Sequence, residues 1–178
     1  AELRFADLVL LTAKELVTVV RHVGAGEIAC AFLAVGKRAL AEFLTKLAPE
    51  DADELIAAVK RTDIKDQMEL KAARGFLAKV LQGFNNTDEL FQKAGLYRLA
   101  RAISAEDTTY IRQISQRFPR AHGRLLNEYL AKVREGGLDD PQVRRLRDQV
   151  IDVVVNLSRR GKIDQRYGQS PVSYEAKK

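Results

Sequence analysis

The residues best suited to chemistry in this chain are two histidines and one cysteine, and they form no catalytic pattern. His22, His122 and Cys30 do not show metal-ligand spacing, because a metal site needs three or four converging ligands. Cys30 lies among small and apolar residues, which predicts a core position. Gly24-Ala25-Gly26 lacks the third glycine and the preceding strand of a dinucleotide-binding loop. We therefore expect no catalytic residues, no metal and no cofactor, and a small enzyme is the least favoured reading.

Acidic clusters have a structural explanation that is stronger than a catalytic one. Glu50, Asp51, Asp53 and Glu54 follow Pro49, a residue that the first turn of a helix tolerates. The helix dipole favours negative charge at such a position. Asp139-Asp140 precedes Pro141 in the same way, so a helix start accounts for that pair too.

Basic residues are concentrated in the second half of the chain. Residues 1–86 carry 12 Lys/Arg and 12 Asp/Glu, whereas residues 87–178 carry 18 and 12, which supplies the whole net charge of +6. Such a half suggests an acidic protein surface, nucleic acid or anionic lipid as partner, and a merely solvated face is the alternative. The candidate partner-binding residues are Arg117, Arg120, Arg124, Arg144, Arg145 and Arg159.

The elements that position these residues are predicted to be helices throughout, because strand patterns are absent and apolar residues recur at helical spacing. Thr12 and Glu15 form a capping box that begins a helix running to Arg21. Gly24 and Gly26 are expected to break that helix, and a shorter helix follows around 27–34.

Later helix boundaries are predicted from similar signals. Ser104 and Asp107 repeat the capping-box pattern before a helix at 108–117, and Pro119 opens the next. Gly95 is expected to stop a short connector helix, and Gly161 the last long one. A long amphipathic helix is expected over 64–81 and another over 143–157.

One apolar pattern occurs twice, about seventy residues apart and with the same offset in every pair. Self-similarity at a fixed period is typical of stacked helical units, although coincidence between two apolar helix pairs is the alternative. The first copy holds Ala31, Leu40, Phe43, Leu47, Leu55 and Val59, and the second Ala102, Ile111, Ile114, Phe118, Leu126 and Leu130. We predict a first helical unit over 1–84, a connector helix over 85–97, a second unit over 98–164 and a flexible basic tail over 165–178.

Several landmarks resemble the FliG family of flagellar motor switch proteins. The resemblance begins at Phe5-Ala-Asp-Leu-Val9, Thr12-Ala-Lys-Glu-Leu16 and Val20-Arg-His-Val23, and continues through Leu40-Ala-Glu-Phe-Leu44 and Ala52-Asp-Glu-Leu55. The second half resembles the same unit more loosely, and the whole likeness spans about 5–163. It implies an all-α fold of right-handed superhelical, armadillo-like repeats in two related units, in a cytoplasmic rotor component that contacts other proteins.

The chain departs from that family where torque is generated. The partner-binding Glu-His-Pro-Gln motif is absent, Glu50 stands about where the family has an arginine, and Ala57-Ala58 about where it has two acids. The resemblance therefore favours scaffolding over torque, and a divergent paralogue is as good a reading as a rotor protein. The helical domain of MgtE-type magnesium transporters has similar architecture, but the basic second half argues against it.

The function expected from the sequence is a non-enzymatic helical scaffold for protein–protein assembly in a motility or secretion-associated complex, with self-association by helix stacking as one mode. The alternative is a helical nucleic-acid-binding module that uses the basic second half. No apolar run approaches the ~20 residues of a membrane span, and Ala1–Leu11 does not resemble a signal peptide. A cytoplasmic location, peripheral to a membrane-associated complex, is the corresponding expectation.

Overall fold

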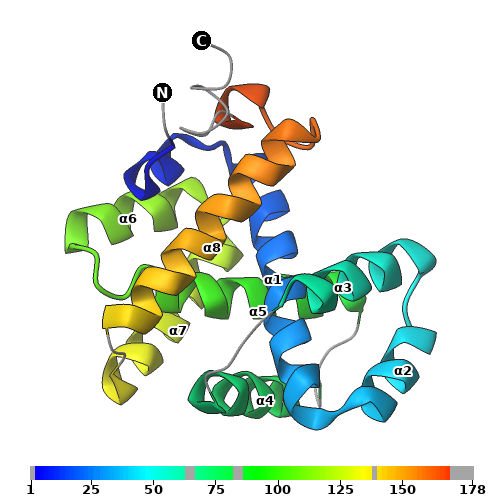
Figure 1. Cartoon of the computed structure of the whole chain (residues 1–178). Coiled ribbons are helices and arrows are strands. Elements are labelled where there is room, and N and C mark those ends of the chain that lie inside the picture. The colour runs from blue at the N-terminus through cyan, green and yellow to red at the C-terminus, as the bar shows by residue number, and fades with distance from the viewer. Residues whose placement is uncertain (1–2, 63–66, 82–85, 138–139, 169–178) are drawn as a thin grey trace. The chain divides into compact units, whose positions relative to one another are not determined.

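The computed structural model describes residues 3–62, 67–81, 86–137 and 140–168, and every regular element in these ranges is a helix (Figure 1). The predicted all-α fold is confirmed. In chain order the elements are the 3-10 helix η1 (Phe5–Leu10), α1 (Ala13–Val35), α2 (Lys37–Thr45), α3 (Pro49–Arg61), α4 (Gln67–Leu81), α5 (Thr87–Ala102), α6 (Thr108–Arg117), α7 (Arg120–Gly136), α8 (Asp140–Arg159) and the 3-10 helix η2 (Gln165–Gly168).

The chain divides into two compact units whose boundaries differ from the predicted ones. Unit 2 is the continuous stretch Arg21–Gly95, and unit 1 combines Ala1–Val20 with Leu96–Lys178. The first twenty residues thus group with the C-terminal helices, whereas the sequence placed them with α2 to α4. Sequence proximity suggested the predicted grouping, but η1 contacts α6, and its Phe5 and Leu8 side chains are buried.

Helix α1 runs without interruption through Gly24 and Gly26, so the predicted break at these glycines is wrong. A Cβ atom placed on Gly24 would lie 1.9 Å from the carbonyl oxygen of Phe91 and 3.0 Å from the amide nitrogen of Gly95, both in α5. The glycine therefore permits a close approach of two helix backbones. Helix α5 likewise continues through Gly95, which the sequence had assigned as its end.

The first capping box is confirmed and the second is corrected. The Thr12 amide donates to Glu15 Oε1 at 3.0 Å, and the Glu15 amide donates to Thr12 Oγ1 at 3.1 Å. At α6 the cap is Asp107, whose Oδ1 accepts from the Tyr110 amide at 2.8 Å. Ser104 instead donates its hydroxyl to the Arg101 carbonyl at 2.8 Å, so it closes the preceding turn and does not open the next helix.

Gly161 ends α8 as predicted. Its φ is +71°, and the Lys162 amide donates to the Leu157 carbonyl at 2.9 Å, which is the pattern of a left-handed helix end. Ile163 then folds back and is buried. Residues 165–168 form η2 with a buried Tyr167, so the predicted flexible tail is wrong for these four residues, because an aromatic anchor holds them. Residues 169–178 lie outside the described range.

The predicted apolar positions lie in or against the two cores. Phe43, Leu55, Ile114, Phe118, Leu126 and Leu130 are buried, whereas Leu47 and Val59 are partly buried. The start of the predicted helix at Ile64 falls outside the described residues, and the described part of that helix is α4.

The helices after α1 and those after α5 follow one another at matching intervals. Helices α2 and α6 begin at Lys37 and Thr108, and α3 and α7 begin at Pro49 and Arg120, so both starts are 71 positions apart. That offset equals the separation of the two apolar patterns. It pairs each position on α2 with one on α6.

Within the described residues, α1 is the one helix long and apolar enough to cross a membrane by length and composition. This length is not apparent in the sequence, because Gly24 and Gly26 predict a break within α1. Its most apolar window has a mean hydropathy of 1.5, and 67% of that window is buried inside the structure. A buried core helix meets the same criterion, so this finding makes no membrane assignment.

Candidate functional site

Helix α6 of unit 1 contacts the N-terminal segment (residues 3–11). The Phe5 ring stacks on Tyr110 with centroids 5.8 Å apart, and the Tyr110 hydroxyl donates to the Phe5 carbonyl at 2.9 Å. The guanidinium of Arg147 lies 4.8 Å from the centroid of the Phe5 ring. Burial, with a smaller contribution from Glu106, raises the pKa of the Tyr110 hydroxyl far above its usual range. These contacts make the segment an integral part of unit 1.

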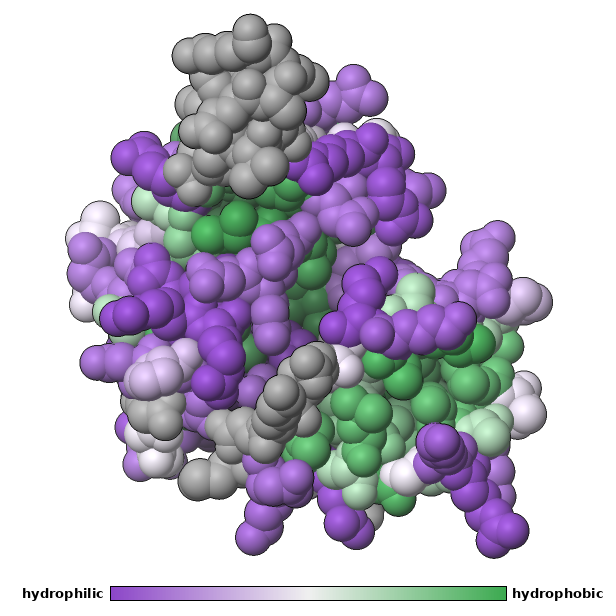
Figure 2. Space-filling view, in the orientation of Figure 1, coloured by the Kyte–Doolittle hydropathy of each residue, from purple (hydrophilic) through white to green (hydrophobic). Residues whose placement is uncertain are grey.

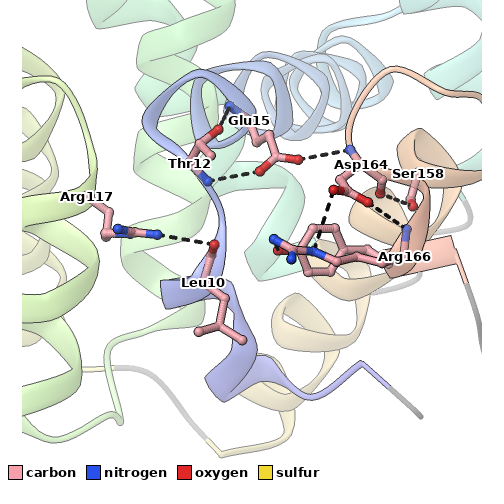
Figure 3. A network of polar contacts seen from close by, with 8 residues as sticks. Leu10, Thr12, Glu15, Arg117, Ser158, Asp164 and Arg166 are labelled. Atoms are coloured by element: carbon pink, nitrogen blue, oxygen red, sulfur yellow. Dashed lines mark hydrogen bonds and ion pairs between the residues drawn. The ribbon is translucent and has the colours of Figure 1, made fainter.

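Arg117, a predicted partner-binding residue, fixes the end of the same segment. Its Nε atom donates to the Leu11 carbonyl at 3.2 Å. Its Nη2 atom donates to the Leu10 carbonyl, also at 3.2 Å (Figure 3). Such charged hydrogen bonds satisfy carbonyls at the exit of η1. Arg117 therefore has a structural role.

Glu15 joins the start of α1 to the chain that follows α8 (Figure 3). One of its carboxylate oxygens accepts from the Thr12 amide and the other accepts from the Asp164 amide at 2.9 Å. Ser158 donates to the Asp164 carbonyl, and the Arg166 amide donates to Asp164 Oδ1 at 2.9 Å. The polar residues here connect backbone segments within unit 1.

The remaining predicted arginines are all exposed but do not converge on one point. Arg120 and Arg124 lie on α7, whereas Arg144, Arg145 and Arg159 lie on α8. At 1.5 Å per residue, the fifteen positions from Arg144 to Arg159 span about 22 Å. Arg159 also donates through Nε to the Gly168 carbonyl at 2.8 Å, which holds η2. The six arginines stay a prediction as a partner surface.

A charged cluster in unit 2 escaped the sequence analysis. Arg21 on α1 pairs with Asp51 on α3 and with Asp88 on α5, the latter at 2.7 Å between Nη1 and Oδ1. Its guanidinium also lies 5.0 Å from the centroid of the Phe91 ring. The neighbouring His22 places Nε2 3.5 Å from Glu54 Oε1. The acidic start of α3 thus binds α1 as well as benefiting from the helix dipole, which periodicity alone could not indicate.

No set of three or more His, Cys, Asp or Glu side chains that could hold a metal ion occurs among the described residues. Cys30 is fully buried, as the sequence predicts. His122 stacks against Phe118 with ring centroids 6.2 Å apart, and His22 faces Glu54. Each histidine has a packing or pairing partner that explains its position without catalysis.

Unit 2 carries an apolar surface around its first short helix. We call it the α2 face and define it by Leu40, Leu44 and Leu47, which share one side of α2 and its end and are only partly buried against the core. Leu33 and Val35 at the end of α1 are 42% and 44% exposed. Figure 2 shows a broad hydrophobic area in this region, at the lower right of the view, bordered by hydrophilic side chains.

The exposed charged residues of α2 and α4 are mostly basic. The exposed charged side chains of α2, its C-terminal end and α4 are one acid, Glu42, and six bases. The bases are Lys37, Arg38, Lys46, Lys71, Arg74 and Lys79. An apolar centre with a charged rim is the common anatomy of a protein-binding surface. The sequence analysis missed it because the first half of the chain is neutral overall: the acids that balance these bases lie largely on α3.

The α2 face and its basic rim are the strongest candidate site in the described residues, and they are suited to binding rather than to bond chemistry. Leucine side chains supply no acid, base or nucleophile, whereas their burial by a partner releases water and is favourable. No family model, no curated protein and no solved structure matches this chain.

Proposed function

We propose that this chain is a non-enzymatic helical scaffold that binds another protein through the α2 face. The observation that carries the proposal is that Leu40, Leu44 and Leu47 of the α2 face are only partly buried, in a unit where Leu33 and Val35 at the end of α1 are more than two-fifths exposed. Monomeric proteins seldom leave a contiguous apolar area open unless it has a partner. The charges of the basic rim would make binding selective for an acidic partner and would raise the association rate.

The finer reading is a pair of armadillo-like units of FliG type, in a cytoplasmic motility or secretion-associated assembly. It is supported by the equal intervals between α2 and α6 and between α3 and α7, together with the landmarks quoted from the sequence. Superposing α2–α4 on α6–α8 tests the repeat: helices that run in different directions in the two sets would refute it.

A capture experiment tests the binding function. A photo-crosslinking amino acid replaces Leu44 in the full chain, and a second protein carries it at Ala41, an exposed position on the same helix. We expect crosslinks to a protein in extract of the source organism from position 44 and far fewer from position 41. Equal yields from the two positions, or none from either, would contradict a docking role for the α2 face.

The predicted arginines enter the same experiment as charge reversals of Arg144 and Arg145. If the basic half of the chain binds the partner, these changes reduce capture and added salt does likewise. A mobility-shift assay with generic DNA and RNA at low salt tests the nucleic-acid alternative, whose affinity would fall steeply with salt. We expect the arginine reversals to leave capture through position 44 unchanged.

A further inference from the structure

One stretch of unit 1, residues 108–127, contains no acidic residue and carries four arginines. It covers α6, the turn that follows and the first half of α7. Arg117 binds backbone carbonyls of the N-terminal segment. The other three arginines are exposed and form no hydrogen bond or ion pair with a residue that the structure describes. They are Arg112, Arg120 and Arg124, and their charges are available to a partner.

These three arginines lie on the outward side of the α6–α7 pair. The two helices meet at Ser115 and Gly123, since a Cβ placed on Gly123 would lie 2.6 Å from the Ser115 carbonyl oxygen. Arg112 lies three positions before Ser115, which places it beside this contact on α6. Arg120 lies three positions before Gly123 on α7, and Arg124 follows it by one turn, about 6 Å along the axis. The opposite sides of both helices are buried, so the three side chains form one exposed surface, which we call the arginine face.

The rest of the arginine face is polar or small. Within residues 108–127 no large apolar side chain is exposed, and Tyr110 and Phe118 are buried. The exposed neighbours of the arginines are Thr109, Gln113, Gln116, Ala121 and Asn127. A protein-binding surface has an apolar centre, which this face lacks. Nucleic-acid interfaces are more polar and more strongly basic, and arginine, hydroxyl and amide side chains supply most of their contacts to phosphate. The composition therefore favours phosphate over an acidic protein.

Two further features indicate the form of the nucleic acid. Sequence-tolerant binding of single strands depends on exposed aromatic rings that stack on the bases, and residues 108–127 expose none. A duplex presents its phosphates without such stacking. The exposed Glu128 follows Arg124 by one helical turn and ends the basic surface, because its carboxylate repels phosphate.

We propose that the arginine face binds the phosphate backbone of double-stranded nucleic acid without regard to sequence. Arg112, Arg120 and Arg124 each contact a phosphate, which the planar guanidinium group can bind through two hydrogen bonds. This surface belongs to unit 1, whereas the α2 face belongs to unit 2. The proposal therefore goes beyond protein binding: a chain that has both activities links a protein to nucleic acid.

The test uses the full chain and a fluorescently labelled DNA duplex of about 20 base pairs, with anisotropy measured over a series of salt concentrations. We expect saturable binding with a Kd of about 10⁻⁴–10⁻⁶ M at physiological salt. The logarithm of the association constant should fall against the logarithm of the salt concentration with a slope of about −3, as three phosphate contacts predict. A duplex of unrelated sequence should bind equally well. An RNA duplex distinguishes the two sources of phosphate, and binding of either duplex supports the proposal.

Single substitutions locate the contact. Arg124→Gln removes one phosphate contact and should reduce the slope by about one. Arg38→Gln on α2 is the matched control, because it removes the same charge from another exposed arginine and should leave the slope unchanged. Glu128→Gln should strengthen binding about threefold at low salt, and this gain should disappear at high salt. Circular dichroism checks that each variant is folded.

Absence of saturable duplex binding at low salt overturns the proposal. Equal changes of slope in Arg124→Gln and Arg38→Gln also overturn it, because the duplex would then respond to net charge alone. Tighter binding to poly-glutamate than to the duplex assigns the face to an acidic protein instead. Tighter binding to phosphatidylcholine vesicles with about 30% phosphatidylglycerol assigns it to a membrane surface. Crosslinking from position 44 is a separate measurement on unit 2, so loss of duplex binding leaves the proposed function of the α2 face standing.

Discussion

Helices α2 and α6 begin 71 positions apart in the chain, yet the apolar side chains paired by that offset differ in burial. Ile111 and Phe118 are buried, whereas their counterparts Leu40 and Leu47 are only partly so. Leu40, Phe43 and Leu47 have apolar counterparts at Ile111, Ile114 and Phe118, so this shared spacing alone does not decide burial. The difference is associated with a third segment, the N-terminal η1, which contacts α6.

That comparison separates a completed surface from an open one. In unit 1, Tyr110 of α6 stacks on Phe5, and Arg117 donates to the Leu11 carbonyl. In unit 2 the position paired with Tyr110 is Ala39, and Leu40, Leu44 and Leu47 are only partly buried. The apolar side of α6 therefore contributes to stability. In our proposal, the α2 face instead serves recognition.

The largest expected effect is at the helix crossing inside unit 2. Gly24→Ala places a Cβ 1.9 Å from the Phe91 carbonyl oxygen, so the backbones of α1 and α5 must separate. We expect a loss of about 3 kcal/mol in unfolding free energy, at the upper end of overpacking costs. Urea unfolding followed by circular dichroism measures it.

Gly75→Ala is the matched control for that prediction. Gly75 lies within α4 with no atom within 4 Å of a built Cβ, so alanine adds helix propensity without a clash. It should raise stability by about 0.5–1 kcal/mol. If both variants change stability alike, the stability of unit 2 does not require the close approach of α1 and α5 at Gly24.

The continuity of α1 and α5 shows where sequence reasoning stops. The capping box at Thr12 and Glu15, the proline that begins α3 and the left-handed end at Gly161 are local signals, and each was predicted correctly. Gly24 and Gly95 look like breakers for the same local reason. Only the packing of one helix on the other shows that they permit contact.

The candidate site was harder to predict than the fold. The repeated apolar pattern that holds Leu40 and Leu47 indicated stacked helices, but a buried stripe and an open one have the same spacing. Which stripe is covered depends on η1, which is remote from α6 in sequence. The predicted arginines were conspicuous by charge, but Arg117 and Arg159 bind backbone carbonyls, a role that composition does not reveal.

Truncating equivalent residues on the two helices sharpens the comparison directly. Ile111→Ala removes buried side-chain carbons from α6 and should cost about 2–4 kcal/mol. Leu40→Ala removes as many carbons from a partly solvated position and should cost about 1 kcal/mol. Urea unfolding measures both; equal costs would mean that the α2 face is as well covered in solution as α6.

A smaller contrast is expected between the two equivalent cations. Arg117→Ala removes the hydrogen bonds to the Leu10 and Leu11 carbonyls and should cost about 1 kcal/mol, since the side chain is exposed. Lys46→Ala should change stability by less than about 0.5 kcal/mol. Hydrogen exchange measured by mass spectrometry identifies the segment that is destabilised. Arg117→Ala should increase exchange in residues 3–11 and leave exchange in α2 unchanged. Faster exchange in α2 as well would argue that Arg117 acts on the whole fold.

The smallest effect on stability at neutral pH is expected from substituting a tyrosine. In alkali the effect should become measurable, and in unit 1 only. Residues 21–95 contain no tyrosine, whereas Tyr110 and Tyr129 lie in unit 1. Burial raises the pKa of Tyr129 to about 12, and the nearby Glu128 adds to the rise. A folded-state pKa above the unfolded value of about 10 means that the neutral form is favoured by folding. Its contribution is complete below about pH 10 and is lost as the pH rises through about 12.

Tyr129→Phe should therefore leave stability nearly unchanged at pH 7 and reduce its decline in alkali. Methyl NMR spectra recorded against pH locate the loss, because Ile114 and Ile163 report on unit 1 and Ile28 on unit 2. We expect the dispersed signals of Ile114 and Ile163 to collapse at lower pH than that of Ile28. Simultaneous collapse in the wild-type chain would show that the units unfold as one cooperative body. In that case the helices that carry the α2 face would not stay folded when unit 1 unfolds.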